Sequence, residues 1–513
     1  MNNRTSMCLD IQDWIKNSNR AIFKMANSDG TVKALNNQII IEYIEKYTYC
    51  LTKHAGKICA IYHQINEEFV GFVIAAFNSH VKILIRRTSL ENKEEINLDV
   101  EFLQKILPVE LVLTDNKLIE SGSYDVKPKE CHQGVNCNED FDFIQLSSGT
   151  TDSAKAFCLR LEGLIESARH IQSVHHVGER SVFLSYLTMT HIYGFVSGFL
   201  LPLVSHATGI ICKTSDIKND PSLLFDLLSG EGVTHASVIM STLQLGLKVR
   251  KEEWNLSKLE CASLGGEKVD ISVYESLLKE MMAQGLPSTA LVNSYGMSEK
   301  GSITMEDPHV GNSLHYKGIN GYVSVGNDSF GETEIIIFDD NLNTVCDETE
   351  GMIGVHSPYI ANVFFNQGVL YPLTYVCIDG KEYYHNGDCG FIKDSKVYVT
   401  GRRINTLTYN GLKIAADVIN EHILKLLKEH NYEVTRSFCF NYPGLVNHIV
   451  CFVDSSDFLE DATWEVVRMK ILSEYHVNIA DYWFEKYEGH GIGKISLPEI
   501  IKKYDAHLKE KGK

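Results

Sequence analysis

The sequence of 513 residues is long enough for roughly two to four domains. Hydrophobic residues make up 44% and charged residues 22% of it, which are values of a folded globular protein and exclude disorder over most of the chain. Acidic residues number 66 against 48 basic ones, and the net charge is −18. This balance argues against a nucleic acid or an anionic membrane as partner, because both attract a positive protein surface.

The location of the protein is predicted from its cysteines and its apolar segments. The 13 cysteines are scattered without a C-x-x-C pair, which favours reduced thiols in a cytoplasmic protein. The first residues lack the pattern of a secretion signal, and the longest apolar stretch, 69–77, is too short to span a bilayer. We therefore expect a cytoplasmic protein without membrane insertion and without a nucleic-acid partner.

The first 140 residues predict a mixed α/β arrangement. The segments 81–85 and 111–113 are typical of strands, 58–62 is a short apolar run, and the apolar segment 69–77 is typical of a buried helix. The polar stretch 126–140 carries Cys131, His132 and Cys137, but no second ligand pair follows at the spacing of a zinc site. We interpret this stretch as a linker loop.

Strands alternate with helices from residue 141 to about residue 398, which predicts parallel sheets with helices on their faces. The expected strands are 182–187, 209–212, 235–240, 262–264 and 290–293, with a helix at 273–282. The shorter segments 334–338, 352–356 and 396–399 alternate in polarity and predict a β-rich closing subdomain.

The pattern changes after Gly401. Ile419, Ile423, Leu426 and Leu427 follow the spacing of an amphipathic helix, and strand-like segments at 433–439 and 448–453 precede a helix at 462–475. We predict an α/β protein with two domains. Residues 1–402 would form layered parallel and mixed sheets with the β-rich closing subdomain, and residues 403–513 a small mobile α+β domain.

Several segments at expected strand ends carry groups that suit a nucleotide. Residues 145–151, with the sequence Q-L-S-S-G-T-T, offer backbone N–H and hydroxyl donors to phosphate oxygens, and Lys155 adds a positive charge. Taken alone, such a turn is more often an ordinary polar surface turn. Residues 293–299 place a hydroxyl beside a carboxylate, which suits a phosphate and Mg²⁺, and Asp388 follows a glycine turn. Gly401-Arg402 and a glycine loop with Lys494 come later.

Taken in this order, these segments resemble the adenylate-forming superfamily of acyl- and aryl-CoA synthetases, fatty acyl-AMP ligases, nonribosomal peptide synthetase adenylation domains and firefly luciferase. The usual phosphate loop S-S-G-T-T-G-x-P-K-G appears as S-S-G-T-T-D-S-A-K-A, N-x-Y-G-x-T-E as N-S-Y-G-M-S-E, and Y-x-T-G-D as Y-H-N-G-D. A G-G-E turn at 265–267, the G-R pair and the final G-K-I are also present. The resemblance covers about residues 50–500.

The resemblance implies a role for each matching residue. The β- and γ-phosphates of ATP would be held by Lys155 and the loop residues Ser147, Ser148, Gly149, Thr150 and Thr151. Ser298 would contact the α-phosphate, Glu299 would ligate Mg²⁺, and Asp388 would bind the ribose hydroxyls near Arg402. The adenine would be bordered by Gly265, Gly266 and Asn293, and the other motif residues assigned to the ATP site are Glu267, Ser294, Tyr295, Gly296 and Met297.

Two further elements follow from the resemblance. Lys494 would be the catalytic lysine that reaches from the small domain to the substrate carboxylate and the α-phosphate, where it offsets the repulsion between anions. The hinge would contain Arg403 and Asn405. His191 begins a segment like the H-x-x-G-L element of acyl and fatty acyl-AMP ligases, and would lie at the carboxylate end of the acid pocket.

The acid pocket is predicted from the neighbours of His191. No aspartate stands where amino-acid-activating domains place the F-D-x-S residue that pairs with an α-amino group, so an acid without that ammonium is favoured. If they line the pocket, the apolar neighbours favour an aryl or acyl substrate, and the alternative is core packing. The pocket residues would be His191, Tyr193, Gly194, Phe195 and Met240.

Departures from the family pattern indicate a specialised branch. Asp152, Ala154 and Ala156 replace a glycine, a proline and a glycine of the phosphate loop, and Asn405 replaces the hinge aspartate. An acidic Asp152 near triphosphate oxygens would lower the affinity for ATP unless it points away or lies near Mg²⁺. A catalytically weakened relative is therefore an alternative, although Lys155, Glu299, Asp388 and Arg402 are all retained.

We expect an ATP- and Mg²⁺-dependent ligase that converts a carboxylic acid to acyl-AMP and then to a thioester on a phosphopantetheine thiol. No carrier domain follows residue 513, so a carrier protein would be a separate partner. Three alternatives remain open: an acyl- or aryl-CoA ligase that uses free coenzyme A, a stand-alone amino-acid adenylase, and a non-catalytic nucleotide-binding relative.

Overall fold

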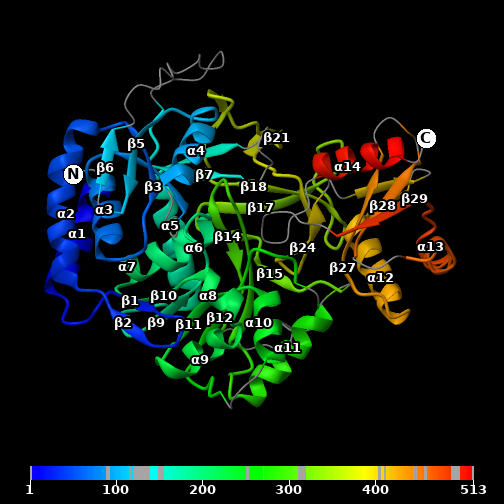
Figure 1. Cartoon of the computed structure of the whole chain (residues 1–513), viewed down its shortest axis with the longest axis horizontal. Coiled ribbons are helices and arrows are strands. Elements are labelled where there is room, and N and C mark those ends of the chain that lie inside the picture. Colours follow the sequence, from blue (N-terminus) through cyan, green and yellow to red (C-terminus); the bar gives the residue numbers. More distant parts are fainter. Residues whose placement is uncertain are drawn as a thin grey trace.

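The computed structural model describes residues 3–87, 93–115, 117–120, 139–147, 155–249, 254–269, 271–309, 319, 321–402, 406–409, 412–442, 445, 447–455, 459–486 and 497–510. Several sheets with helices packed on their faces make up the chain (Figure 1), which confirms the predicted α/β class. No helix in these described ranges is both long and apolar enough to cross a membrane.

The first large sheet carries eight strands in the order β14-β13-β12-β11-β9-β10-β1-β2. The pairs from β1 through β10, β9, β11 and β12 to β13 are parallel, while β2 and β14 run antiparallel at the two edges. The strands are β1 Phe23–Ala26, β2 Val32–Ala34, β9 Val182–Ser185, β10 Thr208–Cys212, β11 His235–Val238, β12 Cys261–Leu264, β13 Leu291–Met297 and β14 Gly301–Met305.

A second sheet, also of eight strands, has the order β20-β19-β8-β7-β4-β3-β5-β6. Strands β7 and β8 form an antiparallel hairpin beside the parallel pairs β4–β3 and β3–β5. The strands are β3 Ile58–Tyr62, β4 Lys82–Arg87, β5 Val109–Thr114, β6 Lys117–Glu120, β7 Phe143–Leu146, β8 Ala156–Leu159, β19 Val363–Asn366 and β20 Val369–Pro372.

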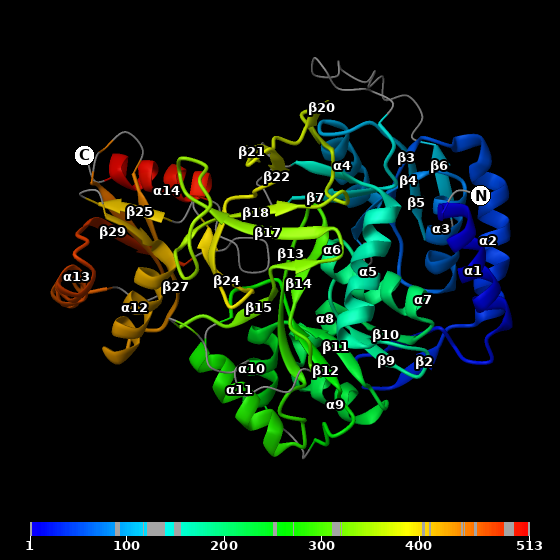
Figure 2. The ribbon, with the colours of Figure 1, turned by 180° about the vertical axis from the view of Figure 1, so that it is seen from behind.

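Helices cover both large sheets (Figure 2). Between the sheets a continuous apolar core joins side chains of α2, α3, α5, α7 and the π-helical turn η2 to Phe143 of β7 and Phe183 of β9. The helices of this part are α1 Asn3–Asn17, α2 Asn37–Leu51, α3 Glu67–Asn78, α4 Lys93–Gln104, α5 Leu161–His175, α6 Ile192–Phe195, η2 Val196–Leu200, α7 Leu201–Ser205, α8 Thr214–Asn219, α9 Ser222–Gly230, α10 Met240–Lys248 and α11 Ile271–Ala283, with the 3₁₀ turn η1 Thr52–His54.

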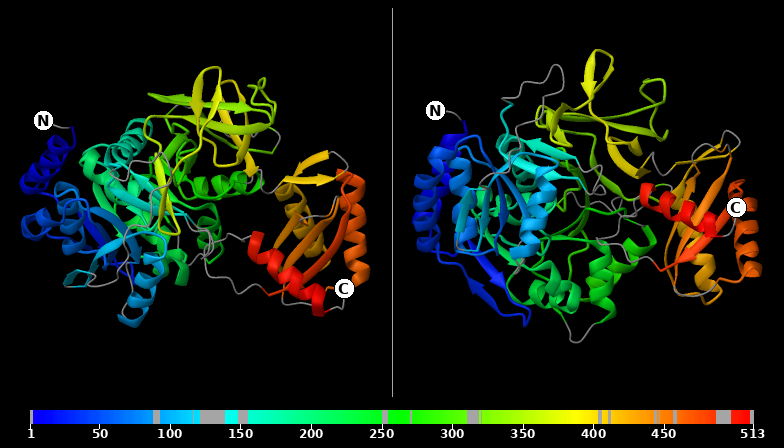
Figure 3. Two further views of the ribbon diagram at one scale, coloured as in Figure 1. Left: turned by 90° about the horizontal axis from the view of Figure 1, so that it is seen from above. Right: turned by 45° about the horizontal axis from the view of Figure 1, so that its top comes forward.

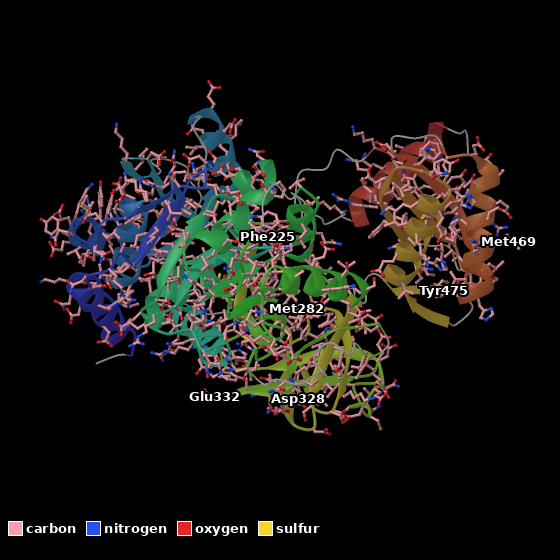
Figure 4. The ribbon with its side chains drawn as sticks, turned by 90° about the horizontal axis from the view of Figure 1, so that it is seen from below. Phe225, Met282, Asp328, Glu332, Met469 and Tyr475 are labelled. Carbon is pink, nitrogen blue, oxygen red and sulfur yellow. The ribbon has the colours of Figure 1, made fainter. Side chains whose placement is uncertain are left out.

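The opposite face of the first sheet packs against a second core. Phe225 of α9 lies there, stacked on Trp254 with ring centroids 4.5 Å apart (Figure 4). Leu184 and Ala236 point to this core, while Phe183 points to the first core. Burial of side chains on both faces explains why these strands are rich in apolar residues.

Six further strands form a third, antiparallel sheet in the order β15-β24-β23-β18-β17-β16. The predicted β-rich segments 334–338, 352–356 and 396–399 all lie in this sheet. Its strands are β15 Ser324–Asn327, β16 Ser329–Phe330, β17 Thr333–Phe338, β18 Gly351–His356, β23 Asp388–Lys393 and β24 Lys396–Arg402, and the hairpin β21 Val376–Ile378 and β22 Lys381–Tyr383 adjoins β18.

The segment from residue 406 onwards stands beside the rest of the chain (Figure 3). Its apolar side chains gather in two clusters, which run from Leu407 to Tyr504 and contain no residue from the other clusters. Its elements are β25 Thr406–Tyr409, β26 Leu412–Ala415, α12 Ala416–Glu429, β27 Val434–Asn441, β28 Ile449–Ser455, α13 Asp461–Tyr475, β29 Ile479–Glu485 and α14 Leu497–Glu510. Met469 lies half exposed on the outer side of α13 (Figure 4).

Two expected strands end earlier than predicted, and the first of them, expected at 182–187, ends at Ser185. The strand predicted at 235–240 ends at Val238, and Met240 is the first residue of α10. The apolar run continues through Ile239 and Met240 because the first turn of α10 is also buried, so composition alone does not mark the change from strand to helix.

The contact between α2 and α3 yields a stability prediction. A Cβ atom at Gly71 of α3 would clash with Tyr43 Cβ and lie 3.0 Å from the Ile40 carbonyl oxygen, both on α2. We expect Gly71→Ala to lower the free energy of unfolding by about 1–3 kcal/mol, because overpacking forces the helices apart. Urea unfolding measures the loss. Gly230→Ala is the control, since nothing lies within 4 Å of the added atom there. Equal effects of both substitutions would contradict the packing explanation.

Candidate functional site

The glycine turn after β12 approaches its neighbours closely. A Cβ at Gly265 would lie 2.9 Å from Tyr193 Cε1 and 3.0 Å from Ser294 Oγ, so only glycine fits without a shift. Gly266 has φ +82°, a backbone conformation that favours glycine. Glu267 accepts hydrogen bonds from the Ser241 N–H at 2.6 Å and the Ser241 hydroxyl at 3.1 Å. It therefore caps the first turn of α10, and burial raises the pKa of its carboxyl.

Strand β13 brings the predicted residues 293–299 to the same edge of the first sheet. Asn293 is buried and its Oδ1 accepts from the Ser294 N–H at 3.0 Å. Ser294 Oγ donates to the Leu264 carbonyl at 2.6 Å, which ties β13 to the end of β12. Gly296 is exposed, Met297 ends the strand, and Ser298 and Glu299 lie in the turn between β13 and β14.

Glu299 is held from two sides. Its side chain is only 7% exposed, and its Oε1 accepts from the Tyr384 hydroxyl at 2.7 Å. Its carbonyl oxygen accepts from the Ala361 N–H at 2.8 Å. Burial raises the pKa of the Glu299 carboxyl, and the hydrogen bond from Tyr384 opposes that shift. The carboxylate is thus desolvated but oriented, which suits a ligand for a cation.

Asp388, the first residue of β23, accepts three hydrogen bonds from side chains. The Tyr295 hydroxyl donates to its Oδ2 at 2.6 Å, and Asn386 Nδ2 donates to the same oxygen at 2.8 Å. Arg402 Nε donates to Oδ1 at 2.9 Å, with the arginine side chain half exposed. Burial and the nearby Asp388 charge raise the pKa of the Tyr295 hydroxyl well above its ordinary value.

The two carboxylates share a crossed arrangement. Tyr295 of the first segment donates to Asp388 of the second, and Tyr384 of the second donates to Glu299 of the first. The segments 295–299 and 384–388 are thereby fixed to one another at both ends. We call this arrangement the crossed tyrosine–carboxylate pair.

The hairpin of β7 and β8 carries the predicted phosphate loop. The Ser147 N–H donates to the Lys155 carbonyl at 2.7 Å, and the Lys155 N–H donates to Ser147 Oγ at 3.0 Å, so these residues close the hairpin. Lys155 is exposed and its Nζ lies 4.8 Å from the ring centroid of Phe364. Ala156 pairs with Leu146 in the strands. The other loop residues fall outside the described ranges: Ser148, Gly149, Thr150, Thr151, Asp152 and Ala154.

The predicted acid-pocket residues divide between surface and core. His191 is exposed and directly precedes α6, and Gly194 packs against the Thr188 carbonyl. The Tyr193 hydroxyl donates to the Ser263 carbonyl at 2.9 Å. Phe195 stacks on Phe143 with centroids 4.5 Å apart inside the core between the large sheets, and the side chain of Met240 belongs to the core beneath α10. Tyr193 and Phe195 therefore do not meet.

Three further residues of this site were not among the predicted site residues. Tyr384 and Asn386 orient the carboxylates, as described above. Lys300 is completely buried next to Glu299, and its Nζ donates to Glu166 Oε2 at 3.0 Å and to the Ser302 carbonyl at 2.7 Å. Burial lowers the pKa of Lys300 and the Glu166 charge opposes this. Tyr384 and Asn386 fall inside the Y-H-N-G-D motif, whereas nothing in the sequence indicates that Lys300 is buried.

Other predicted site residues cannot be placed. Lys494, Arg403 and Asn405 lie outside the described residues, and so do Cys131, His132 and Cys137. Within the described ranges, no three histidine, cysteine, aspartate or glutamate side chains gather as metal ligands. Among the described residues, Glu299, the expected Mg²⁺ ligand, therefore does not belong to a cluster of three such side chains.

The burial of Glu299 predicts a pH-dependent stability. The pKa of the Glu299 carboxyl is raised in the folded chain. Its contribution to the free energy of unfolding is therefore fully present below the ordinary pKa of about 4.3 and is lost as the pH rises through the folded pKa. We expect Glu299→Gln to increase the free energy of unfolding at pH 7–8, with a smaller increase at pH 5. Urea unfolding across this range measures it. The exposed Glu275→Gln on α11 is the control, and a gain that does not change with pH would contradict the assignment.

Comparison with known proteins agrees with this geometry. The family model described as AMP-binding enzyme matches residues 53–365. Aspulvinone E synthetase melA of Aspergillus terreus is 24% identical over 318 residues, which are 59% of this chain and 33% of that protein. D-alanine–D-alanyl carrier protein ligase of Bacillus velezensis is 24% identical over 282 residues, 55% of this chain and 54% of that protein. The chain thus spans a third to about half of the length of these curated relatives.

A solved structure extends the likeness to the whole fold. A structure from a study of fatty acyl-adenylate ligases of E. coli and L. pneumophila superposes with a TM-score of 0.77 at 16% identity, covering 98% of each chain. At that identity the likeness shows the fold alone. The family match covers more than half of the sequence and includes the crossed segment 295–299. The chain belongs to the AMP-binding enzyme family.

Proposed function

We propose that the chain joins a carboxylic acid to the α-phosphate of ATP, releasing pyrophosphate, and then transfers the acyl group to a phosphopantetheine thiol. The observation that carries the proposal is the crossed tyrosine–carboxylate pair. It holds Glu299 and Asp388 at the carboxyl-end edge of a parallel sheet, where open α/β folds bind their ligands. The family match supports the adenylation step.

Asp388 would bind the ribose hydroxyls. An ionised carboxylate offers about four lone-pair sites, and the donors Tyr295, Asn386 and Arg402 fill three of them. The remaining site is on Oδ1, the oxygen that only Arg402 contacts among the described residues. Ribose hydroxyls would donate there, and Arg402, half exposed at the end of β24, would border the sugar.

Glu299 would supply the carboxylate for Mg²⁺, which prefers hard oxygen ligands. The Tyr384 hydroxyl occupies Oε1, so Oε2 is the oxygen that would face the cation. Bound there, Mg²⁺ would offset the negative charge of the phosphate oxygens. Ser298 precedes Glu299 in the same turn and would reach the α-phosphate. Ser147 and Lys155 would hold the terminal phosphates from the hairpin of β7 and β8.

The proposal includes two domains, residues 1–402 and 403–513, with a hinge at Arg403–Asn405 and the catalytic Lys494 in the second. The separate apolar clusters on either side of the boundary support it, because no shared core would have to break during a rotation. The contact between Lys268 and Glu421 is an ion pair of 3.3 Å with Glu421 exposed, which costs little to open.

A carrier protein is the proposed thiol acceptor, and coenzyme A is the alternative. The matched D-alanyl carrier protein ligase supports the carrier, since its name states that acceptor. The acid would be activated at the end of the first sheet, and His191, exposed before α6, would lie near its carboxylate.

ATP–pyrophosphate exchange across a panel of aryl, fatty, hydroxy and amino acids tests the proposal. Exchange with one acid establishes adenylation and separates an amino-acid adenylase from the other candidates. Exchange with no acid, in protein that binds ATP, would contradict the proposal and favour a non-catalytic nucleotide-binding relative. Supplying the active acid with coenzyme A or with a phosphopantetheinylated carrier then identifies the acceptor.

Lys494→Ala separates the two half-reactions. We expect the substitution to lower the adenylation rate by roughly 100-fold to 1,000-fold, because a charge that stabilises the transition state is lost. Thioester formation from supplied acyl-AMP is expected to continue. Lys502→Ala, on the exposed side of α14, is the control. If Lys494→Ala reduced both half-reactions equally, its assignment to adenylation would be wrong.

A further inference from the structure

Three serines form a row across adjacent parallel strands of the first sheet. Ser185 at the end of β9 pairs in register with Ser237 of β11, and Ser237 pairs with Ser263 of β12. Residues paired in register project to the same face. All three side chains are buried, with exposures of 2%, 2% and 5%. On β13 the residue paired with Ser263 is Val292, and Ser294, two residues further along, brings its Oγ to 3.4 Å from Ser263 Oγ.

Helix α6 and the turn η2 cover this serine row. Gly198 of η2 lies so close that a Cβ there would be 2.9 Å from Ser185 Oγ. The turn is π-helical, a rare form of helix that is frequently found at functional sites. The Tyr193 hydroxyl reaches the row from α6 and donates to the Ser263 carbonyl at 2.9 Å. Burial raises the pKa of that hydroxyl, and hydrogen bonds with Ser237, Ser263 and Ser294 act against the shift.

The hydroxyl of Ser185 is unsatisfied. Within the described residues, Ser185 Oγ is buried and has no hydrogen-bond partner. A buried hydroxyl without a partner costs about 1–3 kcal/mol, so such groups in proteins call for an explanation. Gln145 Oε1 is in the same state, while its Nε2 donates to the Thr190 carbonyl at 3.0 Å in the segment that leads into α6. Two unsatisfied groups therefore border the segment that covers the serine row.

The serine row has a closed layer beneath it. Two residues earlier on the same strands, Phe183, His235 and Cys261 pair in register and are buried. This layer lies roughly 6.6 Å further along the strands. One His235 ring nitrogen contacts Thr234 Oγ1 at 2.8 Å and the other contacts the His175 carbonyl at 2.9 Å, so the imidazole is fixed. A long hydrocarbon tail has no path through this layer.

We infer that the serine row is the floor of the acid pocket, and that the acid is short and carries a hydrogen-bonding substituent in place of a fatty tail. The inference rests on the proposed function and specifies its substrate class. The Tyr193 hydroxyl contacts the row at Ser263, and the substituent of the acid would reach the row at Ser185. Ser185 Oγ would then gain the partner that it lacks.

Matched pairs of acids test the substrate class by ATP–pyrophosphate exchange. Lactate is compared with isobutyrate and 3-hydroxybutyrate with 3-methylbutyrate, each pair differing by a hydroxyl against a methyl group, and L-alanine, D-alanine and dodecanoate complete the set. We expect a short polar acid to exceed its hydrocarbon counterpart at least about tenfold in kcat/KM. A preference for dodecanoate or for the hydrocarbon members would overturn the inference but leave the proposed function standing. Exchange with no acid would overturn both.

Ser185→Ala supplies a second test with a readout besides activity. Because Ser185 Oγ has no partner among the described residues, its removal is expected to leave the thermal midpoint unchanged or higher. It should raise KM for the polar acid about tenfold and leave that for the hydrocarbon counterpart unaltered. Ser205→Ala is the matched control, since Ser205 Oγ donates to the Leu201 carbonyl in α7, and it should lower the midpoint without changing KM. An unchanged preference in Ser185→Ala, or a lowered midpoint, would overturn the inference.

Discussion

The site depends on two hydrogen bonds that cross between distant segments of the chain. Tyr295 holds Asp388, and Tyr384 holds Glu299, although 93 and 85 residues separate the partners in sequence. Tyr384 is buried and Tyr295 is partly buried, so each hydroxyl has few alternatives to the carboxylate that faces it. Displacing either strand end would leave a buried acceptor and a buried donor unsatisfied at once. The first sheet and the antiparallel sheet of β23 are therefore locked in the relative position that the site requires.

Buried ionisable groups around this lock are costly to the fold. Glu299 is a desolvated carboxylate, and Lys300 beside it is a completely buried cation whose charge is met by Glu166 of α5. Removing one partner of a buried ion pair usually destabilises a protein far more than replacing the whole pair by apolar residues. The hairpin between β13 and β14 is thus fixed to α5 through Lys300 and to the antiparallel sheet through Glu299. The turn is held rigidly while its charged side chains lose contact with water, as is common where a carboxylate must be held in one orientation.

Local pattern predicted the regular elements well, because the strands of the first sheet are short, mostly apolar segments with buried side chains that pack against the core around Phe225. The motif segments at strand ends were also predicted, and the side chains of Glu299, Asp388 and Arg402 do lie near one another. Contacts that depend on which strands pair, and in which register, could not be predicted from the sequence. The serine row is visible only when the register of β9, β11 and β12 is known, since Ser185, Ser237 and Ser263 are ordinary polar residues in the sequence. Likewise the burial of Lys300 and the core position of Phe195 depend on neighbours from α5 and β7. The residues around Lys494 remain a prediction.

Arg402 is both a partner of Asp388 and the last residue of β24, directly before the segment that leads to β25. The side chain that borders the carboxylate and the backbone that departs from the sheet belong to one residue. If the proposed hinge directly after Arg402 moves the guanidinium relative to Asp388, the orientation of the second domain and the affinity for a ligand at Asp388 would be coupled. By thermodynamic reciprocity, each would then alter the other by the same factor. Arg402, at the end of β24, would thus couple the binding of a ligand at Asp388 to the orientation of the segment that follows.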